Sequence, residues 1–160
     1  MTSLIDPKKY TKTLDLLRSF FLAKNFYEVH TQNRLSILAA CEDPETVATY
    51  NYGGNIWPLP QTGQMWLEYE LLKNPDAAGF FCLSTSYRAE PNPVPGRHET
   101  IFPMFEFEMH GDVHDLKVME IELCEHLGIP LDGENIKTYG EWQDKYSVRE
   151  LDHGHEAAIG

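Results

Sequence analysis

Two alternating segments joined by a proline-rich loop constrain the fold of this chain most strongly. Residues 80–88 and 101–109 both alternate with the two-residue period of a β-strand. In the second segment one side carries Ile101, Phe105, Phe107 and Met109, and the other carries Phe102, Met104, Glu106 and Glu108. The loop between the segments contains Pro91, Pro93 and Pro95. Prolines restrict the backbone conformation but have no N–H group to pair with a neighbouring strand. The pattern predicts a pair of strands with one apolar face and one face that carries carboxylates.

Three segments have the 3.6-residue apolar period of helices, namely residues 7–24, 62–72 and 112–127. The first helix has an apolar stripe of Tyr10, Leu14, Leu17 and Phe21, and the third has Leu116, Met119, Leu123 and Leu127. The expected helix boundaries are an N-cap at Asp6 and at Thr62, a C-cap at Gly128, and a left-handed Asn25 after the first helix. Together with the strands, these helices predict an α+β fold in which helices flank an antiparallel sheet.

The remaining segments give weaker signals. We expect short strands at 26–31, 47–52 and 56–59, with a turn at 53–55, while residues 32–45 fit either a helix or a strand. After Pro130 the pattern allows a strand at 136–139 and a helical turn at 140–146. There are no repeats and no linker, so residues 1–160 are predicted to form a single domain.

The charge of the chain limits its partners. The formal net charge is −12, with 13 Lys and Arg against 25 Asp and Glu. Such a surface repels phosphate backbones unless its basic residues cluster, which argues against nucleic acid as the main partner. No apolar run is long enough to cross a membrane, and residues 1–10 lack the apolar core that a signal peptide has. The odd set of three cysteines is typical of reduced thiols in the cytoplasm.

The charged residues of the strand pair fall where they can hold an anion. Arg88 ends the first strand, and Arg97 and His98 lie in the loop, where they are suited to closing over outer phosphates of a nucleotide. Phe102 offers a ring for a purine, Glu90, Glu106 or Glu108 can accept from an amino group, and carboxylates beside phosphates can hold Mg²⁺. The alternative is a solvated salt-bridge network of Arg88, Glu90, Arg97 and Glu106.

These motifs resemble the second signature of class II aminoacyl-tRNA synthetases of the aspartyl, asparaginyl and lysyl group. The matching residues are Tyr87, Arg88 and Glu90, then Arg97, His98, Phe102, Glu106 and Glu108 after the loop. Weaker matches to the asparaginyl enzymes are Cys41 with Glu42, Thr62 to Gln64 with Glu68, and Thr138 with Tyr139 and Glu141. The resemblance implies a partial class II synthetase-like catalytic fold, the N-terminal half of that domain.

The resemblance also implies a role for each matching residue. For ATP, Arg88 would contact the α-phosphate and the reacting carboxylate, Glu90 and Phe102 would bind adenine, and Arg97 and His98 would reach the outer phosphates. For the amino acid, Gln64 and Glu42 would bind the α-amino group and Glu106 would lie near the side chain, while Glu108 would help to hold Mg²⁺. The implied reaction is ATP-dependent formation of an aminoacyl adenylate by a cytoplasmic, homodimeric enzyme of protein biosynthesis, with asparagine or aspartate as substrate.

The sequence departs from the family pattern at three points. Gln32 stands where the first signature has a proline, and this puts the usual dimer interface in doubt. Ile101 replaces the usual Glu, and the glycine-rich third signature with its ATP-binding arginine is missing before Gly160. Two alternatives to the synthetase activity therefore stay open: a paralog that forms an amide such as asparagine without tRNA, and a non-catalytic module that binds ATP or an amino acid. The net charge and the missing anticodon-binding domain disfavour tRNA as a partner of this chain by itself.

Overall fold

The structure is a computed structural model that describes residues 5–31, 39, 42–95, 98–131, 138–148, 154–155 and 158. The chain divides into two compact units, Met1–Gly128 and Ile129–Gly160, and each is described by itself. The single domain expected over residues 1–160 remains a prediction.

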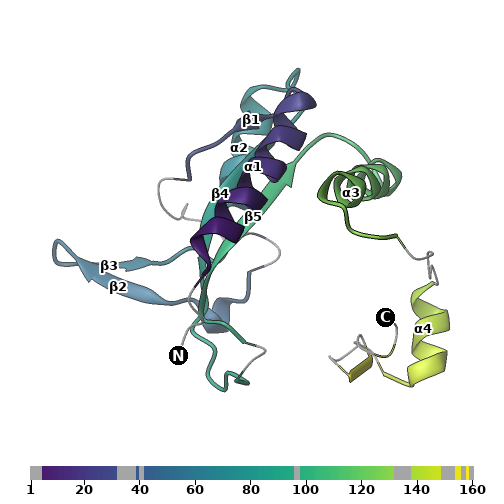
Figure 1. Ribbon diagram of the computed structural model, residues 1–160. Helices are drawn as coiled ribbons and strands as arrows, with labels where there is room; N and C mark the ends of the chain where they lie inside the picture. Colours follow the sequence, from purple (N-terminus) through teal and green to yellow (C-terminus); the bar gives the residue numbers. More distant parts are fainter. Residues whose placement is uncertain are drawn as a thin grey trace. The chain divides into compact units, whose positions relative to one another are not determined.

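The first unit is built on a three-stranded sheet of order β1-β4-β5 (Figure 1). β4 (Phe80–Tyr87) and β5 (Ile101–Glu108) are antiparallel, in a register that runs from Phe80 opposite Glu108 to Tyr87 opposite Ile101. The strand expected at 26–31 is shorter, because only β1 (Tyr27–Glu28) pairs, in parallel with β4. The expected α+β class is confirmed, and the parallel β1 makes the sheet mixed.

One face of the sheet is covered by α1 (Pro7–Ala23) and α3 (Val113–Leu127), which also contact each other. Figure 1 shows α1 crossing this face. The core on this side contains Phe20, Phe21, Phe26, Phe81 and Met119, with Phe105, Phe107, Met109 and Leu123 packed against it. Phe21 is fully buried, and its ring centroid lies 4.9 Å from that of Phe107 and 5.4 Å from that of Phe105. Phe105, Phe107 and Met109, on the apolar side of β5 that alternation predicted, therefore face these helices. Ile101, the fourth residue predicted on that side, is 49% exposed, so the prediction is wrong there.

The ends of these two helices follow local chemistry. The Asp6 side chain accepts hydrogen bonds from the backbone N–H groups of Lys8 and Lys9, as expected for an N-cap. Asn25 has φ of 63°, which confirms the left-handed conformation expected after α1. α3 begins with a capping box formed by Asp112 and Asp115 and ends at left-handed Gly128.

The other face of the sheet packs against α2 (Gln64–Lys73) through Leu67 and Leu71, which contact Phe80 and Cys82. The N-cap expected at Thr62 is wrong by one residue, because Gly63 occupies that position and makes no side-chain cap. Thr62 nevertheless accepts the Gln64 N–H at 3.0 Å. Its hydroxyl also donates to the carboxylate of Glu106 on β5.

A second sheet is the two-stranded hairpin of β2 (Thr49–Tyr52) and β3 (Asn55–Pro58), which extends away from β4 and β5 in Figure 1. Gly53 and Gly54 form its turn, with φ of 61° and 77°, as the tight turn between such strands requires. Before the hairpin lies a 3₁₀ turn, Pro44–Thr46. Residues 32–38 and 40–41, where helix and strand could not be separated, lie outside the described residues.

The second unit contains α4 (Tyr139–Tyr146), which begins with a capping box of Thr138 and Glu141. The strand expected at 136–139 is wrong at its end, because Tyr139 is helical, and residues 132–137 lie outside the described residues. Within the described parts of both units, no helix combines the length and the apolar character that crossing a membrane would require.

Candidate functional site

The polar face of the β4–β5 pair gathers the chemistry of the first unit. The register places Cys82 opposite Glu106, Ser84 opposite Met104 and Ser86 opposite Phe102, all on the side of the sheet that α2 covers in part. Ser84 and Ser86 are buried, although they are polar. Small hydroxyl residues on this face leave room for the longer side chains of β5 and for a ligand above them.

Glu106 is a side chain on this face whose orientation is fixed by several hydrogen bonds. Its carboxylate accepts hydrogen bonds from the Thr62 hydroxyl, from the Gly63 N–H at 2.7 Å and from the Ser84 hydroxyl at 2.9 Å. Donors from two separate elements, the start of α2 and the middle of β4, therefore converge on one carboxylate. Hydrogen bonds to a charged acceptor are the strong ones, so this arrangement fixes the orientation of Glu106.

Gly63 allows this close approach because it lacks a side chain. A Cβ atom at this position would lie 2.6 Å from Cys82 Sγ, 3.0 Å from Thr31 Cγ2 and 3.2 Å from Glu106 Oε2. The first distance is too short for any real contact between a carbon and a sulfur atom. Burial raises the pKa of the Cys82 thiol to about 12, so the thiol beside Gly63 stays neutral and acts as packing.

A chain of polar groups continues from Glu106 along β5. Gln64 Nε2 donates to Glu68 Oε1 at 2.8 Å, and the Gln64 side chain also hydrogen-bonds Glu108. Burial raises the pKa of Glu108, and the negative charges of Glu68 and Glu106 add to this effect, while the bond from Gln64 opposes it. Gln64, Glu106 and Glu108, three of the predicted site residues, line one cavity of about 600 Å³. This cavity is large enough for an amino acid.

At the other end of the face, Arg88 follows β4 directly. Its backbone is fixed by an antiparallel bridge to Val47 and by donation of its N–H to Thr100 O at 2.8 Å. Its guanidinium makes a long contact of 3.4 Å with the Ser86 hydroxyl, and its Cζ atom lies 6.0 Å from the centre of the Phe102 ring. No carboxylate of the described residues forms an ion pair with Arg88. The backbone is therefore fixed, and the charge of the side chain is available for a ligand.

This arrangement bears on the alternative of a salt-bridge network. Glu106 is held by hydroxyl groups and an amide, and among the described residues Arg88, Glu90 and Glu106 form no ion pairs with one another. Arg97, the fourth member of that network, lies outside the described residues. The described part of the network is absent.

The loop after β4 carries the other predicted nucleotide contacts. Glu90 is half-buried two residues beyond Arg88. His98 Nδ1 accepts the Val94 N–H at 3.2 Å, and the His98 N–H donates to Val94 O at 2.9 Å. Because Nδ1 acts as acceptor, the neutral His98 ring carries its proton on Nε2 and keeps one donor for a ligand.

Glu42 lies near the start of the hairpin rather than on the sheet. Its carboxylate accepts the Ala39 N–H at 2.8 Å and the Gln61 N–H at 3.3 Å. Gln61 is fully buried and bonds Asp43 and Thr46. Glu42 thus stabilises the segment that leads to Thr62, and a role in binding the amino acid stays a prediction.

The sequence analysis did not predict the residues whose hydrogen bonds orient the predicted site residues. Thr62, Gly63 and Ser84 orient Glu106, and Glu68 orients Gln64. The signal for Ser84 was present, because it lies with Ser86 on the same side of the strand as Arg88. The contact of Gly63 with Cys82 leaves no local sequence pattern.

The described residues contain no group of three or more His, Cys, Asp or Glu side chains that is arranged to hold a metal ion. Glu108 can supply carboxylate oxygen, the ligand type that Mg²⁺ prefers, but most of the remaining ligands would have to come from a bound phosphate and water.

Comparison with known proteins supports the fold. No family model matches the sequence, and no curated protein matches it. Among solved structures, asparaginyl-tRNA synthetase from Pyrococcus horikoshii, complexed with asparaginyl-adenylate, matches with a TM-score of 0.61 and 22% identity, over 87% of this chain and 36% of that one. A pyrrolysyl-tRNA synthetase from Desulfitobacterium hafniense matches with a TM-score of 0.58 and 19% identity, over 76% of this chain and 46% of that one.

A putative aspartyl-tRNA synthetase from Leishmania major matches with a TM-score of 0.52 and 20% identity, over 86% of this chain and 29% of that one. The resemblance to the class II synthetase catalytic domain is therefore confirmed in fold. The chain spans less than half the length of each of these synthetases, in agreement with the expected half-domain.

Proposed function

We propose that this protein takes part in ATP-dependent activation of an amino acid, as a ligase of the asparaginyl-tRNA synthetase type. The observation that carries the proposal is the position of Arg88 on the sheet. Its guanidinium has no ion-pair partner among the described residues, lies beside Phe102 and shares a sheet face with the oriented carboxylate of Glu106. One end of the face suits an anion and an aromatic base, and the other suits an ammonium or amide group.

In this proposal ATP lies across the Arg88 end. Phe102 stacks on the adenine and Glu90 accepts from its amino group. Arg88 contacts the α-phosphate through its planar set of donors, which matches phosphate oxygens. Arg97 and His98 reach the outer phosphates, and the Nε2 proton of His98 is the group that donates. Glu108 would supply a carboxylate oxygen to hold Mg²⁺.

The amino acid lies at the other end, in the cavity beside β5. Gln64 binds its α-amino group, with Glu42 as a further contact, and Glu106 lies near its side chain. Asparagine or aspartate is the proposed substrate, which is supported by the resemblance of 62–68 and Glu106 to the asparaginyl enzymes. The fixed orientation of Glu106 supports selection among small polar side chains, because a rigid acceptor discriminates better than a free one.

The proposed chemistry needs no covalent enzyme intermediate. An oxygen of the amino-acid carboxylate attacks the α-phosphorus, the bond to the bridging oxygen breaks, and pyrophosphate leaves with that bond's electron pair. Arg88 stabilises the charge that develops on the α-phosphoryl oxygens, and the sheet holds the reactants in line. Mg²⁺ supplies further charge neutralisation when it is bound.

The test is exchange of labelled pyrophosphate into ATP. We expect exchange that depends on a single amino acid and is lost in Arg88→Ala. Absence of exchange with all twenty amino acids, in protein shown to be folded by circular dichroism, contradicts the activity. If calorimetry shows that such protein still binds ATP or an amino acid, the function is that of a non-catalytic binding module.

A second candidate is supported by the net charge of −12. This charge disfavours tRNA as the acceptor of the activated amino acid. In this candidate function, ammonia or another amine attacks the activated carbonyl of the adenylate instead, and AMP is released. Formation of asparagine from aspartate and ammonia would support this candidate, and aminoacylation of tRNA would contradict it. We also propose a homodimer, from the resemblance, and a cytoplasmic location, from the free thiols of Cys82 and Cys124.

A further inference from the structure

A cavity of about 390 Å³ lies along one edge of β4 and is separate from the cavity that contains Gln64, Glu106 and Glu108. Among the described residues the two cavities have no lining residue in common. Its walls come from α1, from the β2–β3 hairpin, from the residues that follow β1 and from β4 itself. Its volume falls within the range of about 300 to 1,000 Å³ that is usual for ligand sites. The proposed activation of an amino acid makes no use of this cavity.

The edge of β4 beside this cavity is paired at both of its ends. At one end Phe81 O accepts the Val29 N–H at 2.8 Å, where the chain leaves β1. At the other end Tyr87 donates its N–H to Pro60 O at 2.9 Å. Phe81 and Tyr87 are six residues apart, which corresponds to about 20 Å of extended strand. The interval between these two pairings therefore has room for a strand of about four residues.

Leu83 and Thr85 lie in this interval. Every second residue of a strand directs its backbone groups to the same edge, so both residues direct an N–H and a C=O away from β5, as Phe81 and Tyr87 do. No described residue hydrogen-bonds these four groups. Leu83 is half-buried and Thr85 is exposed. Unpaired backbone groups at a strand edge are a template for an added strand.

The side chains of the cavity suit the side chains of such a strand. Tyr10 of α1, Tyr50 of β2 and Tyr87 of β4 line the cavity, and their hydroxyl groups make no hydrogen bond with any described residue. Trp66 of α2 adds a fourth ring. Alternate side chains of an added strand point to opposite faces of the sheet, where these rings are available for contact.

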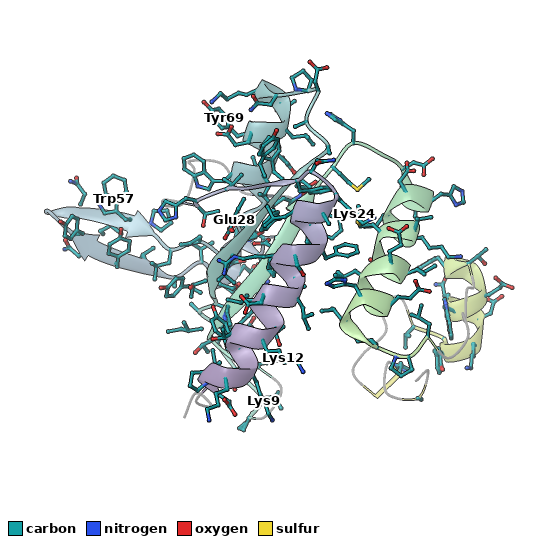
Figure 2. The ribbon with its side chains drawn as sticks, turned by 45° about the horizontal axis from the view of Figure 1, so that its top comes forward. Lys9, Lys12, Lys24, Glu28, Trp57 and Tyr69 are labelled. Atoms are coloured by element: carbon teal, nitrogen blue, oxygen red, sulfur yellow. The ribbon has the colours of Figure 1, made fainter. Side chains whose placement is uncertain are left out.

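The charge of the cavity restricts its occupant. Among the described residues, no Asp, Glu, Lys or Arg side chain lines it, although the chain has a net charge of −12. Figure 2 shows Lys9 and Lys12 on α1 and Glu28 on β1, and none of them is among the lining residues. Glu28 instead pairs with Arg18 at 2.8 Å. A charged side chain or a charged chain end would lose its hydration here without gaining an ion pair. An uncharged segment inside a longer polypeptide fits these conditions.

We propose that the edge of β4 at Leu83 and Thr85 is a docking site for an uncharged, extended segment of another protein, which adds to the sheet as a strand of about four residues. A flat heterocycle would bond two of the four free backbone groups, whereas an extended segment bonds all four. In strand addition the main-chain hydrogen bonds give affinity and the contacts of alternate side chains give specificity. This inference does not depend on the activation of an amino acid.

The test is titration calorimetry of the protein with the capped peptide acetyl-valyl-tyrosyl-valyl-threonyl amide, whose β-branched and aromatic residues favour the extended conformation. We expect one peptide to bind per chain, with a dissociation constant on the order of 100 µM. The same peptide methylated at its backbone nitrogen atoms cannot donate to β4 and binds at least about tenfold more weakly. The same peptide with free, charged ends also binds at least about tenfold more weakly.

Variants of the protein locate the binding. Thr85→Pro removes an N–H that makes no bond to β5, and it raises the dissociation constant by about tenfold or more. Thr85→Val keeps this N–H and leaves the constant unchanged. Tyr10→Ser removes a ring from the wall and raises the constant by about fivefold. Its matched control is Tyr69→Ser, at an exposed ring of α2 outside the cavity, which leaves the constant unchanged.

Circular dichroism and urea unfolding establish that each variant is folded. Absence of binding up to about 2 mM capped peptide contradicts the proposal. Equal binding of the methylated peptide contradicts strand addition, and equal binding of the peptide with free ends contradicts an internal segment as the occupant. Binding that Thr85→Pro and Tyr10→Ser leave intact, in folded protein, contradicts this edge of β4 as the site.

Discussion

The two ends of one sheet face differ in how their charges are held. At one end Glu106 accepts hydrogen bonds from Thr62, Gly63 and Ser84. At the other end Arg88 makes one long hydrogen bond, to Ser86, and no ion pair with any described residue. The backbones at both ends are fixed by the same β4–β5 ladder. The difference therefore lies in the side chains and not in the rigidity of the fold.

This difference separates stability from binding. A carboxylate held by three donors contributes to folding, because its removal leaves those donors without a partner. An arginine without an ion-pair partner among the described residues contributes little to folding, and its charge remains for a ligand. The Glu106 end should thus be sensitive in unfolding experiments and the Arg88 end in activity experiments.

The largest effect is expected for Arg88→Ala. Loss of a group that stabilises developing charge lowers the rate of pyrophosphate exchange by about 100-fold to 1,000-fold. The free energy of unfolding changes by less than about 0.5 kcal/mol, since the side chain has few contacts to lose. Arg18→Ala is the matched control. Arg18 lies on α1 and pairs with Glu28 of β1 at 2.8 Å, so this substitution should leave the rate of exchange unchanged. Equal loss of exchange in both variants would break the distinction.

Glu106→Ala is expected to act chiefly on folding. It leaves the N–H of Gly63 and the hydroxyl groups of Thr62 and Ser84 without their acceptor, which lowers the free energy of unfolding by about 3 kcal/mol. Urea denaturation measures this change. Glu90→Ala, at a half-buried loop carboxylate, should cost less than about 0.5 kcal/mol. If Glu106→Ala proves as mild as Glu90→Ala, the two ends of the face do not differ as described.

Gly63→Ala tests the packing behind Glu106. The new Cβ would lie 2.6 Å from Cys82 Sγ, so the free energy of unfolding falls by about 1 to 3 kcal/mol. Cys82→Ala removes the clashing sulfur, and the two changes together should cost less than the sum of their separate costs. Strict additivity in this double-mutant cycle would show that the thiol is not the obstacle.

The smallest effect concerns the pH dependence of Glu108. Burial raises its pKa above the ordinary value of 4.5, with further contributions from Glu68 and Glu106, so the folded protein binds this proton more tightly than the unfolded chain. The contribution of Glu108 to stability is therefore greatest below pH 4.5 and declines as the pH rises through the raised pKa.

In Glu108→Gln this decline is absent. Urea unfolding across the acidic range should show the variant gaining stability relative to the natural protein as the pH rises, up to a constant difference. Because Glu108 is only partly buried, the change is modest. Parallel pH curves, or a relative loss in the variant, would contradict the assigned cause of the pKa shift.

Much of the fold could be predicted from the sequence because its determinants are local. Alternation in 101–109 separated Phe105 and Phe107 from Glu106 and Glu108, and the strand ladder preserves that separation. Asp6, Asn25 and Gly128 end their helices by interactions with neighbouring residues. The parallel pairing of β1 could not be predicted, because it depends on a strand some fifty residues further along the chain.

The site was predictable in part for the same reason. Strand periodicity placed Arg88, Phe102 and Glu106 on one face. The three groups that orient Glu106 come from Thr62, Gly63 and Ser84, which are 44, 43 and 22 residues away in the chain. Which donors meet a carboxylate over such distances is decided by packing, and no local pattern records it.

The most direct test of a phosphate site at Arg88 compares AMP with adenosine by titration calorimetry. AMP carries the α-phosphate and lacks the outer phosphates, so the comparison isolates Arg88 from Arg97 and His98. We expect the natural protein to bind AMP about 10-fold to 100-fold more tightly than adenosine, as charge-assisted hydrogen bonds require. In Arg88→Ala this preference disappears while adenosine affinity is retained. Equal affinity of the natural protein for the two ligands, or a preference for AMP that survives in Arg88→Ala, would contradict the account.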